Sequence, residues 1–366
     1  MHSDTLAWLR WVLVPQLGLK RSHTLLNLVD SPADLFRHPE RWPLPEAVKV
    51  TLRAMHRLGE QHPIHRQALD QLRWAERANH QLISLADSAY PPNLNQIHDA
   101  PLMLWGIGDT SLLQTPQIAL VGSRHASPGA LSHAHRLAAD LARAGLVVTS
   151  GGALGIDSAS HRGALAVQGG TIAVLGCGVD VGYPKPNKAL FASLASQGLL
   201  LSEHPLGTQP RPGHFPRRNR LISALAELVV VVEATLNSGS LVTAQHGLDQ
   251  GKDIFAMPGD IGNPNTAGCH RLIQDGAYLL ADAKDILRHL KFQQHPSPQP
   301  EPIAMDHLSP LQQKIMALLR FGILPLDGLA HHLELAVHQL LEAILELELE
   351  GLIEQQPGGY TLSDIA

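Results

Sequence analysis

Glycine-rich turns that directly follow short apolar segments constrain this chain more than any other feature of its sequence. The most informative stretch, residues 147–164, reads VVTSGGALGIDSASHRGA: an apolar run, a glycine-rich turn and a segment of helical pattern. Such a turn presents backbone N–H groups and the positive end of a helix dipole to an anion. Any tight turn between a strand and a helix also needs glycine, so this stretch alone leaves both interpretations open.

The turn belongs to a longer alternation that begins at Gln117. Apolar strand-like runs alternate with helical segments, one of which starts at Ser127-Pro128, a capping residue followed by proline. This alternation predicts a parallel sheet with helices on both faces. In such sheets, ligands bind beyond the carboxyl ends of the strands. The expected strands are 118–122, 146–150, 171–175, 199–202, 228–232 and 253–256.

Polar or glycine-rich signatures follow these strands. Backbone amide nests combined with cations predict an anion-binding groove along one sheet edge. The dinucleotide and Walker A fingerprints are absent, since the glycine spacings do not fit. Several nests with separated cations suit a repeating phosphate backbone better than a single mononucleotide. The candidate residues are Gly122, Ser123 and Arg124; Ser150, Gly151, Gly152, Ala153 and Gly155; Lys185 and Asn187; and Ser238, Gly239 and Ser240.

A proline-rich loop at 205–216 adds a basic and aromatic cluster. It runs into Phe215-Pro216-Arg217-Arg218-Asn219-Arg220, where three arginines stand within four residues. Arginines beside an aromatic ring suit phosphate contact and base stacking, with a solvated charged loop as the alternative. Phe215 and Tyr183 are the candidates for stacking on bases.

We expect no catalytic residues, metal or cofactor. Ser150, Ser158 and Ser160 lie near Asp157 and His161, but all five fall within one turn and helix. Asp157 fits an early helix position that complements the dipole, and it could pair with His161 one turn later. The close histidine pairs 133/135 and 331/332 have no Cys or carboxylate at zinc-ligand spacing.

The remaining segments predict the domain organisation. Residues 1–80 have helical periodicity, with a turn at 15–21 that faintly resembles a SAM or helix-hairpin-helix module. Residues 81–290 form the α/β domain, 291–305 a proline-rich linker, and 306–366 a winged-helix-like domain. Residues 301–366 carry two Lys/Arg against ten Asp/Glu, which favours protein interaction or packing over DNA reading by that domain.

The same sequence indicates where the chain works. Its two cysteines, the absence of a signal-peptide pattern, and a longest aliphatic run (228–232) too short for a bilayer predict a cytoplasmic protein with no membrane partner.

Together, these motifs resemble the bacterial DNA-processing protein A family (DprA, also called Smf). The resemblance covers most of residues 81–290. It implies an extended Rossmann domain that binds single-stranded DNA without sequence preference. It also implies a homodimer that protects incoming strands during natural transformation and helps load the RecA recombinase. The matching runs are 119–124, 150–157 with Ala159 and His161, 182–184 with Asn187, 215–220, 238–243 and 255–259.

The resemblance assigns DNA contact to Arg124, the amides of 151–155, Lys185, Arg218, Arg220 and residues 238–240. The alternative is a nucleotide-processing hydrolase similar to the Rossmann phosphoribohydrolases that resemble lysine decarboxylase. Those enzymes carry a Pro-Gly-Gly-x-Gly-Thr nest and a catalytic Glu downstream. Here the turn begins Ser150-Gly151-Gly152 with no Thr or Glu in register, which favours binding.

Overall fold

The computed structural model describes residues 2–291, 308–319, 323–356 and 358–362. The chain divides into two compact units, Met1–His295 and Pro296–Ala366. No helix among the described residues is long and apolar enough to cross a bilayer. Cys177 and Cys269 are both buried and both free thiols.

The first unit begins with amphipathic helices, as the periodicity of residues 1–80 predicted. Their apolar faces share one core, in which Trp11, Leu52 and Met55 are fully buried. The same core continues into the sheet, where Trp105 Nε1 donates a hydrogen bond to Gln71 Oε1 at 2.7 Å. The predicted boundary at residue 80 is not tested and stays a prediction. The helices are α1 (His2–Val12), α2 (Leu19–Leu26), α3 (Asp34–Arg37), α4 (Glu46–Leu58) and α5 (Pro63–Ala75).

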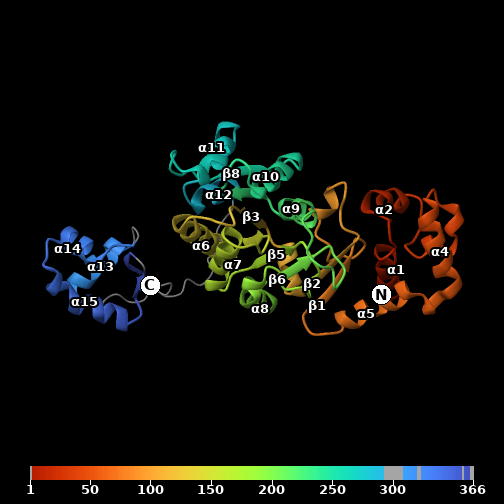
Figure 1. The fold of residues 1–366 in the computed structure, drawn as a ribbon, viewed down its shortest axis with the longest axis horizontal. Coiled ribbons are helices and arrows are strands. Elements are labelled where there is room, and N and C mark those ends of the chain that lie inside the picture. Colours follow the sequence, from red (N-terminus) through yellow and green to blue (C-terminus); the bar gives the residue numbers. More distant parts are fainter. Residues whose placement is uncertain (1, 292–307, 320–322, 357, 363–366) are drawn as a thin grey trace. The chain divides into compact units, whose positions relative to one another are not determined.

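A nine-stranded sheet forms the centre of this unit, in the order β1-β2-β6-β5-β4-β3-β7-β8-β9. Figure 1 labels β1, β2, β6, β5, β3 and β8 of this sheet. The strands from β6 to β9 pair in parallel, which confirms the predicted parallel sheet. The strands are β1 (His80–Ser84), β2 (Met103–Gly108), β3 (Gln117–Val121), β4 (Val147–Ser150), β5 (Thr171–Leu175), β6 (Leu199–Ser202), β7 (Leu228–Val231), β8 (Asp253–Ala256) and β9 (Tyr278–Leu279).

Helices cover both faces of the sheet because successive strand residues point to opposite sides. In β3, Ile118 and Leu120 join the core under α6, α7 and α12, whereas Ala119 and Val121 join the core under α9 and α10. The remaining helices of the unit are α6 (Pro128–Arg143), α7 (Ile156–Ala166), α8 (Lys188–Gln197), α9 (His214–Leu225), α10 (Gly239–Asp249), α11 (Ala267–Gln274) and α12 (Ala283–His289).

Two features differ from the sequence prediction. The segment before Gln117 supplies two strands, β1 and β2, which extend the parallel sheet with antiparallel pairing at β2–β6. The basic cluster at 217–220 lies on a helix and not at the end of a loop, since α9 begins at His214. The sequence predicted a loop that ends at Pro216. In the structure Pro216 lies in the first turn of α9, where a helix tolerates a residue without an N–H group.

The second unit has the predicted winged-helix pattern. Three helices, α13 (Pro310–Leu319), α14 (Leu326–Leu333) and α15 (Val337–Leu349), precede a hairpin of β10 (Ile353–Gln356) and β11 (Gly359–Leu362). Ile315, Leu329, Leu340 and Leu347 are fully buried in its core. The predicted linker at 291–305 lies outside the described residues except for Lys291.

Candidate nucleic-acid interface

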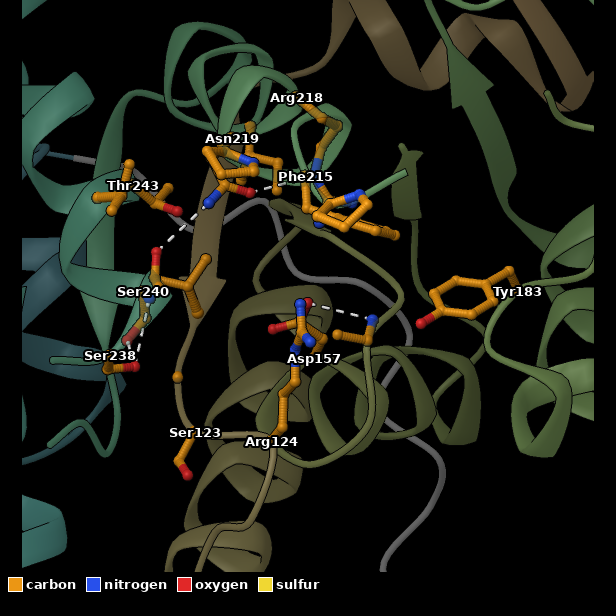
Figure 2. A pocket seen from close by; sticks show the side chains of 18 residues that line it. Ser123, Arg124, Asp157, Tyr183, Phe215, Arg218, Asn219, Ser238, Ser240 and Thr243 are labelled. Carbon is orange, nitrogen blue, oxygen red and sulfur yellow. Dashed lines mark hydrogen bonds between the residues drawn. The ribbon is translucent and has the colours of Figure 1, made fainter. Parts of the chain in front are cut away.

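A groove of about 580 Å³ opens beyond the carboxyl ends of β3 and β7. From β3 the chain proceeds to β4, β5 and β6 on one side, and β7 to β9 lie on the other. The junction of β3 and β7 is therefore the topological switch point, where open α/β sheets bind ligands. Figure 2 shows side chains from several loops converging there. The lining residues are Val121–Arg124, Ala153, Asp157, Tyr183, Pro212, Phe215, Pro216, Arg218, Asn219, Ile222, Ser238–Ser240, Val242 and Thr243.

Glycines let the turns at this edge approach each other. Gly155 has φ +78°, and a Cβ there would overlap the carbonyl oxygen of Ser123. The backbone N–H of Ile156 donates to that carbonyl at 3.1 Å, which ties the start of α7 to the turn after β3. The glycine-rich turn thereby fixes the position of the neighbouring Gly122-Ser123-Arg124 turn.

One wall of the groove combines an exposed cation with two aromatic rings. The Arg124 guanidinium carbon lies 5.8 Å from the centroid of the Phe215 ring. The Tyr183 ring lies 5.6 Å from the Phe215 ring at an interplanar angle of 38°. Arg124 is exposed, and Tyr183 is 42% exposed, so this wall offers a charge for a phosphate and π-faces for bases.

The opposite wall is the first turn of α10 (Figure 2). Ser238 is its N-cap, and its Oγ accepts from the backbone N–H of Ser240 at 3.3 Å. Asn219 connects this turn to α9, because its Nδ2 donates to the Gly239 carbonyl at 3.3 Å. A capped helix N-terminus carries partial positive charge, which favours an anion on this side as well.

The central glycine-rich turn holds an anion of its own. Asp157 Oδ2 accepts from the backbone N–H groups of Gly151 and Ala153, each at 3.2 Å. Asn187 Nδ2 donates to the Gly152 carbonyl and to Ser158 Oγ, each at 2.9 Å. Two amides that the sequence assigned to a phosphate therefore bind an internal carboxylate. Burial raises the pKa of Asp157, and the positive charge of Arg218 opposes that rise.

Arg218 supports this turn from inside. It is 4% exposed, and its Nη1 donates to the Gly151 carbonyl at 2.6 Å and also to the Val174 carbonyl. Burial lowers the pKa of Arg218 to about 10, so the guanidinium remains charged at neutral pH. Arg218 joins the ends of β4 and β5 to α9 while one side of it lines the groove.

The other two arginines of the cluster do not line the groove. Arg220 is 5% exposed and forms ion pairs with Glu203 at 2.5 Å and with Asp99 at 3.0 Å. Arg217 is exposed and lies 3.8 Å from Glu203. Burial raises the pKa of Glu203, and the two arginines oppose the rise. Two arginines that the sequence predicted to bind DNA phosphates are therefore paired with carboxylates of the protein itself.

The sequence allowed a contact between Asp157 and His161, but the structure gives each residue other partners. His161 Nδ1 lies 2.7 Å from Thr171 Oγ1, whose own proton is donated to the Val148 carbonyl. The imidazole therefore donates through Nδ1, and burial lowers its pKa to about 3. Among the described residues, no group of three or more His, Cys, Asp or Glu side chains is placed to hold a metal ion.

Comparison with known proteins decides the family. The family described as DNA recombination-mediator protein A matches residues 81–291, and the DprA winged helix domain matches residues 295–359. The chain belongs to this DprA family. It is 42% identical over 294 residues to Protein Smf of Escherichia coli, covering 78% of each chain. It is 44% identical over 209 residues to DNA processing protein DprA of Streptococcus pneumoniae, covering 57% of this chain and 74% of the relative.

Solved DprA structures agree with the fold. The X-ray structure of DprA from Streptococcus pneumoniae aligns with a TM-score of 0.63 at 34% identity, covering 79% of this chain and 97% of that one. DNA processing protein A from Helicobacter pylori, whose structure addresses its single-stranded DNA binding mode, aligns with a TM-score of 0.53 at 33% identity. That alignment covers 59% of this chain and 98% of the Helicobacter chain.

In this DprA-family chain, the structure sorts the predicted site residues into two groups. Those that line the groove are Gly122, Ser123, Arg124, Ala153, Tyr183, Phe215, Arg218, Asn219, Ser238, Gly239 and Ser240. Those outside the lining are Ser150, Gly151, Gly152, Gly155, Lys185, Asn187, Arg217 and Arg220. Their contact with DNA stays a prediction in both groups.

Sequence reasoning missed several groove residues. Thr243 and Val242 lie within α10 one turn after the Ser238-Gly239-Ser240 signature, so helical spacing from that signature could have identified them. Ile222 lies on α9, one turn after Arg218 and Asn219. Ile222 lines the groove because this stretch is helical, whereas the sequence predicted a loop up to the arginine cluster.

Proposed function

We propose that this chain binds single-stranded DNA without sequence preference in the groove beyond the carboxyl ends of β3 and β7, and acts there as a recombination mediator. The observation that carries the proposal is the exposed Arg124 beside the Phe215 and Tyr183 rings, opposite the first turn of α10. Family membership supports it, as does the structural similarity to the Helicobacter pylori protein, whose single-stranded DNA binding has been studied structurally.

The chemistry of the groove fits a single strand. Arg124 in the groove and the exposed Lys185 outside its lining supply positive charge to phosphates, and the N-terminus of α10 supplies partial positive charge. Bases can stack on Tyr183 and Phe215, and stacking tolerates every base because each has a π-face. Arg218, Arg220 and Asp157 support the turns from inside, so exposed cations and rings make the contacts with the strand.

The test is fluorescence anisotropy with labelled single-stranded and double-stranded oligonucleotides over a salt series. We expect single strands to bind in preference to duplexes, with affinity falling as salt rises. Arg124→Ala with Lys185→Ala should weaken binding and reduce the salt slope by about 0.7 for each lost phosphate contact. Arg143→Ala, in the last turn of α6, is the matched control and should bind as the wild type does. Salt-insensitive single-strand binding, or wild-type affinity in the double variant, would contradict the proposal.

A binding role without catalysis is part of the same proposal. Asp157 is occupied by two backbone amides, and Glu233 accepts from the Ser127 N–H at 3.0 Å and from the Ser127 hydroxyl at 2.6 Å. Asp157 in the groove lining and the buried Glu233 that follows β7 thus both have structural partners. The alternative, a nucleotide-processing hydrolase, requires release of base or phosphate from nucleoside monophosphates. Chromatography of such mixtures after incubation with the protein should show the nucleotides unchanged.

We further propose that the protein works in the cytoplasm as a homodimer, during natural transformation, and helps load RecA. The dimer is supported by exposed apolar side chains: Leu279 (53% exposed) and Tyr278 (48%) lie on the edge strand β9, and Ile261 (92%) lies in the loop that follows β8. Sedimentation velocity should show a dimer that Ile261→Asp with Leu279→Asp converts to a monomer. Strand exchange by RecA on DNA coated with single-strand-binding protein should start faster when the protein is present.

A further inference from the structure

The outer face of α15, the third helix of the winged-helix unit, carries an apolar stripe that its own domain does not cover. Leu341, Leu345 and Leu349 follow each other at intervals of four residues and are 50%, 56% and 80% exposed. Residues four apart lie on one face of a helix. The opposite face provides the core, where Leu340, Ile344 and Leu347 are buried. The three leucines of the stripe are therefore not part of the hydrophobic core of this unit.

Glutamates flank this stripe on both sides. At 3.6 residues per turn, Glu342 falls beside the leucine row on one side and Glu348 on the other, and both are exposed. Glu346 turns further round, where its Oε2 accepts from Gln312 Nε2 at 2.8 Å within the domain. The charge around the stripe matches the whole segment, since residues 301–366 hold two Lys/Arg and ten Asp/Glu.

Charge complementarity selects the occupant of this face. Nucleic acid would bring phosphates against glutamates. A second copy of α15 packed along the same stripe would bring Glu342 and Glu348 against like charges, which destabilises a helix pair. Residues 292–307 of the chain carry two carboxylates and no Lys or Arg, so they offer no complementary charge. An amphipathic helix with basic flanks satisfies both the apolar stripe and its rims.

We propose that the outer face of α15 is a docking surface for a partner protein's amphipathic helix, whose apolar stripe is bordered by Lys or Arg. Leucines at positions 341, 345 and 349 would pack against the partner's apolar residues, while Glu342 and Glu348 would pair with its cations. The winged-helix unit then serves as a recruitment module. The inference is independent of the proposed DNA groove, which lies wholly within the first unit.

The test uses the full chain and a synthetic helical peptide of leucine and lysine, with leucine at positions i, i+3, i+4 and i+7. We expect saturable binding in anisotropy that Leu341→Gln with Leu345→Gln weakens at least tenfold. Glutamine is a good helix former and both positions point outward, so circular dichroism should be unchanged. Glu342→Gln with Glu348→Gln should weaken binding several-fold and flatten its salt dependence while leaving the leucines in place.

Two matched controls separate docking from general attraction. Val50→Gln with Leu58→Gln changes exposed apolar residues on α4, 53% and 40% exposed, and should bind the peptide as the wild type does. A peptide of identical composition, permuted so that leucines surround the helix, should bind at least tenfold more weakly. Equal binding of the permuted peptide, or wild-type affinity in the leucine variant, would overturn the proposal.

Other occupants would also be visible. If the leucine variant abolished self-association in sedimentation, a second copy would be the occupant and the proposal would be wrong. If it abolished binding to duplex DNA, the face would be a nucleic-acid surface, and the proposal would again be wrong. Single-stranded DNA affinity should be the same in the leucine variant and the wild type, so failure here is distinguishable from failure of the groove.

Discussion

The turn after β3 and the first turns of α9 each place one arginine in the groove lining, Arg124 and Arg218, but the two regions use arginine differently. Arg124 is exposed and adjacent to a ring, whereas Arg218 and Arg220 are 4% and 5% exposed and bound to protein groups. Arg124 can bind the negative charge of a ligand. The guanidinium groups of Arg218 and Arg220 instead bind carbonyl groups at the strand ends and a carboxylate of the protein itself. The number of arginines in a motif therefore overstates the positive charge that a ligand meets.

The physical reason lies in solvation. A guanidinium removed from water has a large desolvation cost unless carbonyls or carboxylates replace the water. Gly151 and Val174 carbonyls do so for Arg218, and Glu203 does so for Arg220. Arg124 is exposed, so solvent hydrates its guanidinium group and a phosphate can replace that solvent. Substitution of a buried arginine should therefore reduce stability, whereas substitution of Arg124 should reduce DNA affinity. Four experiments test this difference, in order of decreasing effect.

Arg218→Ala should have the largest effect, and it acts on stability. Removing the guanidinium leaves the Gly151 and Val174 carbonyls without this donor and the Asp157 carboxylate without this nearby cation. Breaking such a buried arrangement costs about 3–5 kcal/mol. Urea unfolding followed by circular dichroism measures it, with the exposed neighbour Arg217→Ala as control, expected within about 0.5 kcal/mol of the wild type. Similar stabilities for the two variants would remove the distinction between the regions.

His161 should make stability depend on pH within the buried region. Its folded pKa of about 3 lies below the ordinary value of 6.5, so below pH 6.5 the unfolded chain binds a proton that the folded chain does not. Stability is therefore present above pH 6.5 and lost as pH falls towards 3, by about 2 kcal/mol at pH 5. The free energy of unfolding at pH 5 and pH 7 should differ by that much more in the wild type than in His161→Gln. Parallel profiles would show that folding does not lower the pKa of His161.

Arg124→Ala should leave stability unchanged and weaken binding. We expect the free energy of unfolding to stay within about 0.5 kcal/mol of the wild type, as for other surface substitutions. Single-stranded DNA affinity should fall about tenfold, equal to about 1.4 kcal/mol. Anisotropy and urea unfolding on the same preparation measure both. A large stability loss with unchanged affinity would place Arg124 in the same class as Arg218.

Ser238→Ala should have the smallest effect. Loss of the N-cap of α10 costs about 1 kcal/mol of stability, because Ser240 N–H loses its side-chain acceptor. Ser193→Ala, within α8, removes a hydroxyl that caps no helix end and should be nearly neutral. Thermal unfolding of both variants measures the difference. If Ser238→Ala also weakens DNA binding, the opposite wall of the groove contributes to recognition as Arg124 does.

Much of the fold could be predicted from local patterns. Strand and helix alternation from Gln117 and the helical first 80 residues predicted elements that the structure confirms, as did the winged-helix pattern after residue 308. The sequence analysis did not predict β1 and β2. Met103–Gly108 is apolar in nearly every position, and its pairing with β1 and β6 cannot be deduced from the local pattern. The start of α9 was missed because His214-Phe215-Pro216 follows a proline-rich loop with no capping side chain.

The glycine-rich stretch at 147–164 separates what the local sequence determines from what the tertiary structure determines. Its residues alone determined a strand, a turn that only glycine permits at Gly155, and a helix. They also predicted a nest of amides, which exists. Asp157 of the same stretch fills that nest through local hydrogen bonds, and only the packed fold brought Arg218 to it, from 61 positions further along the chain. A buried charged or polar group is costly to leave without partners, so the fold supplies those partners internally and leaves the exposed Arg124 in the groove lining.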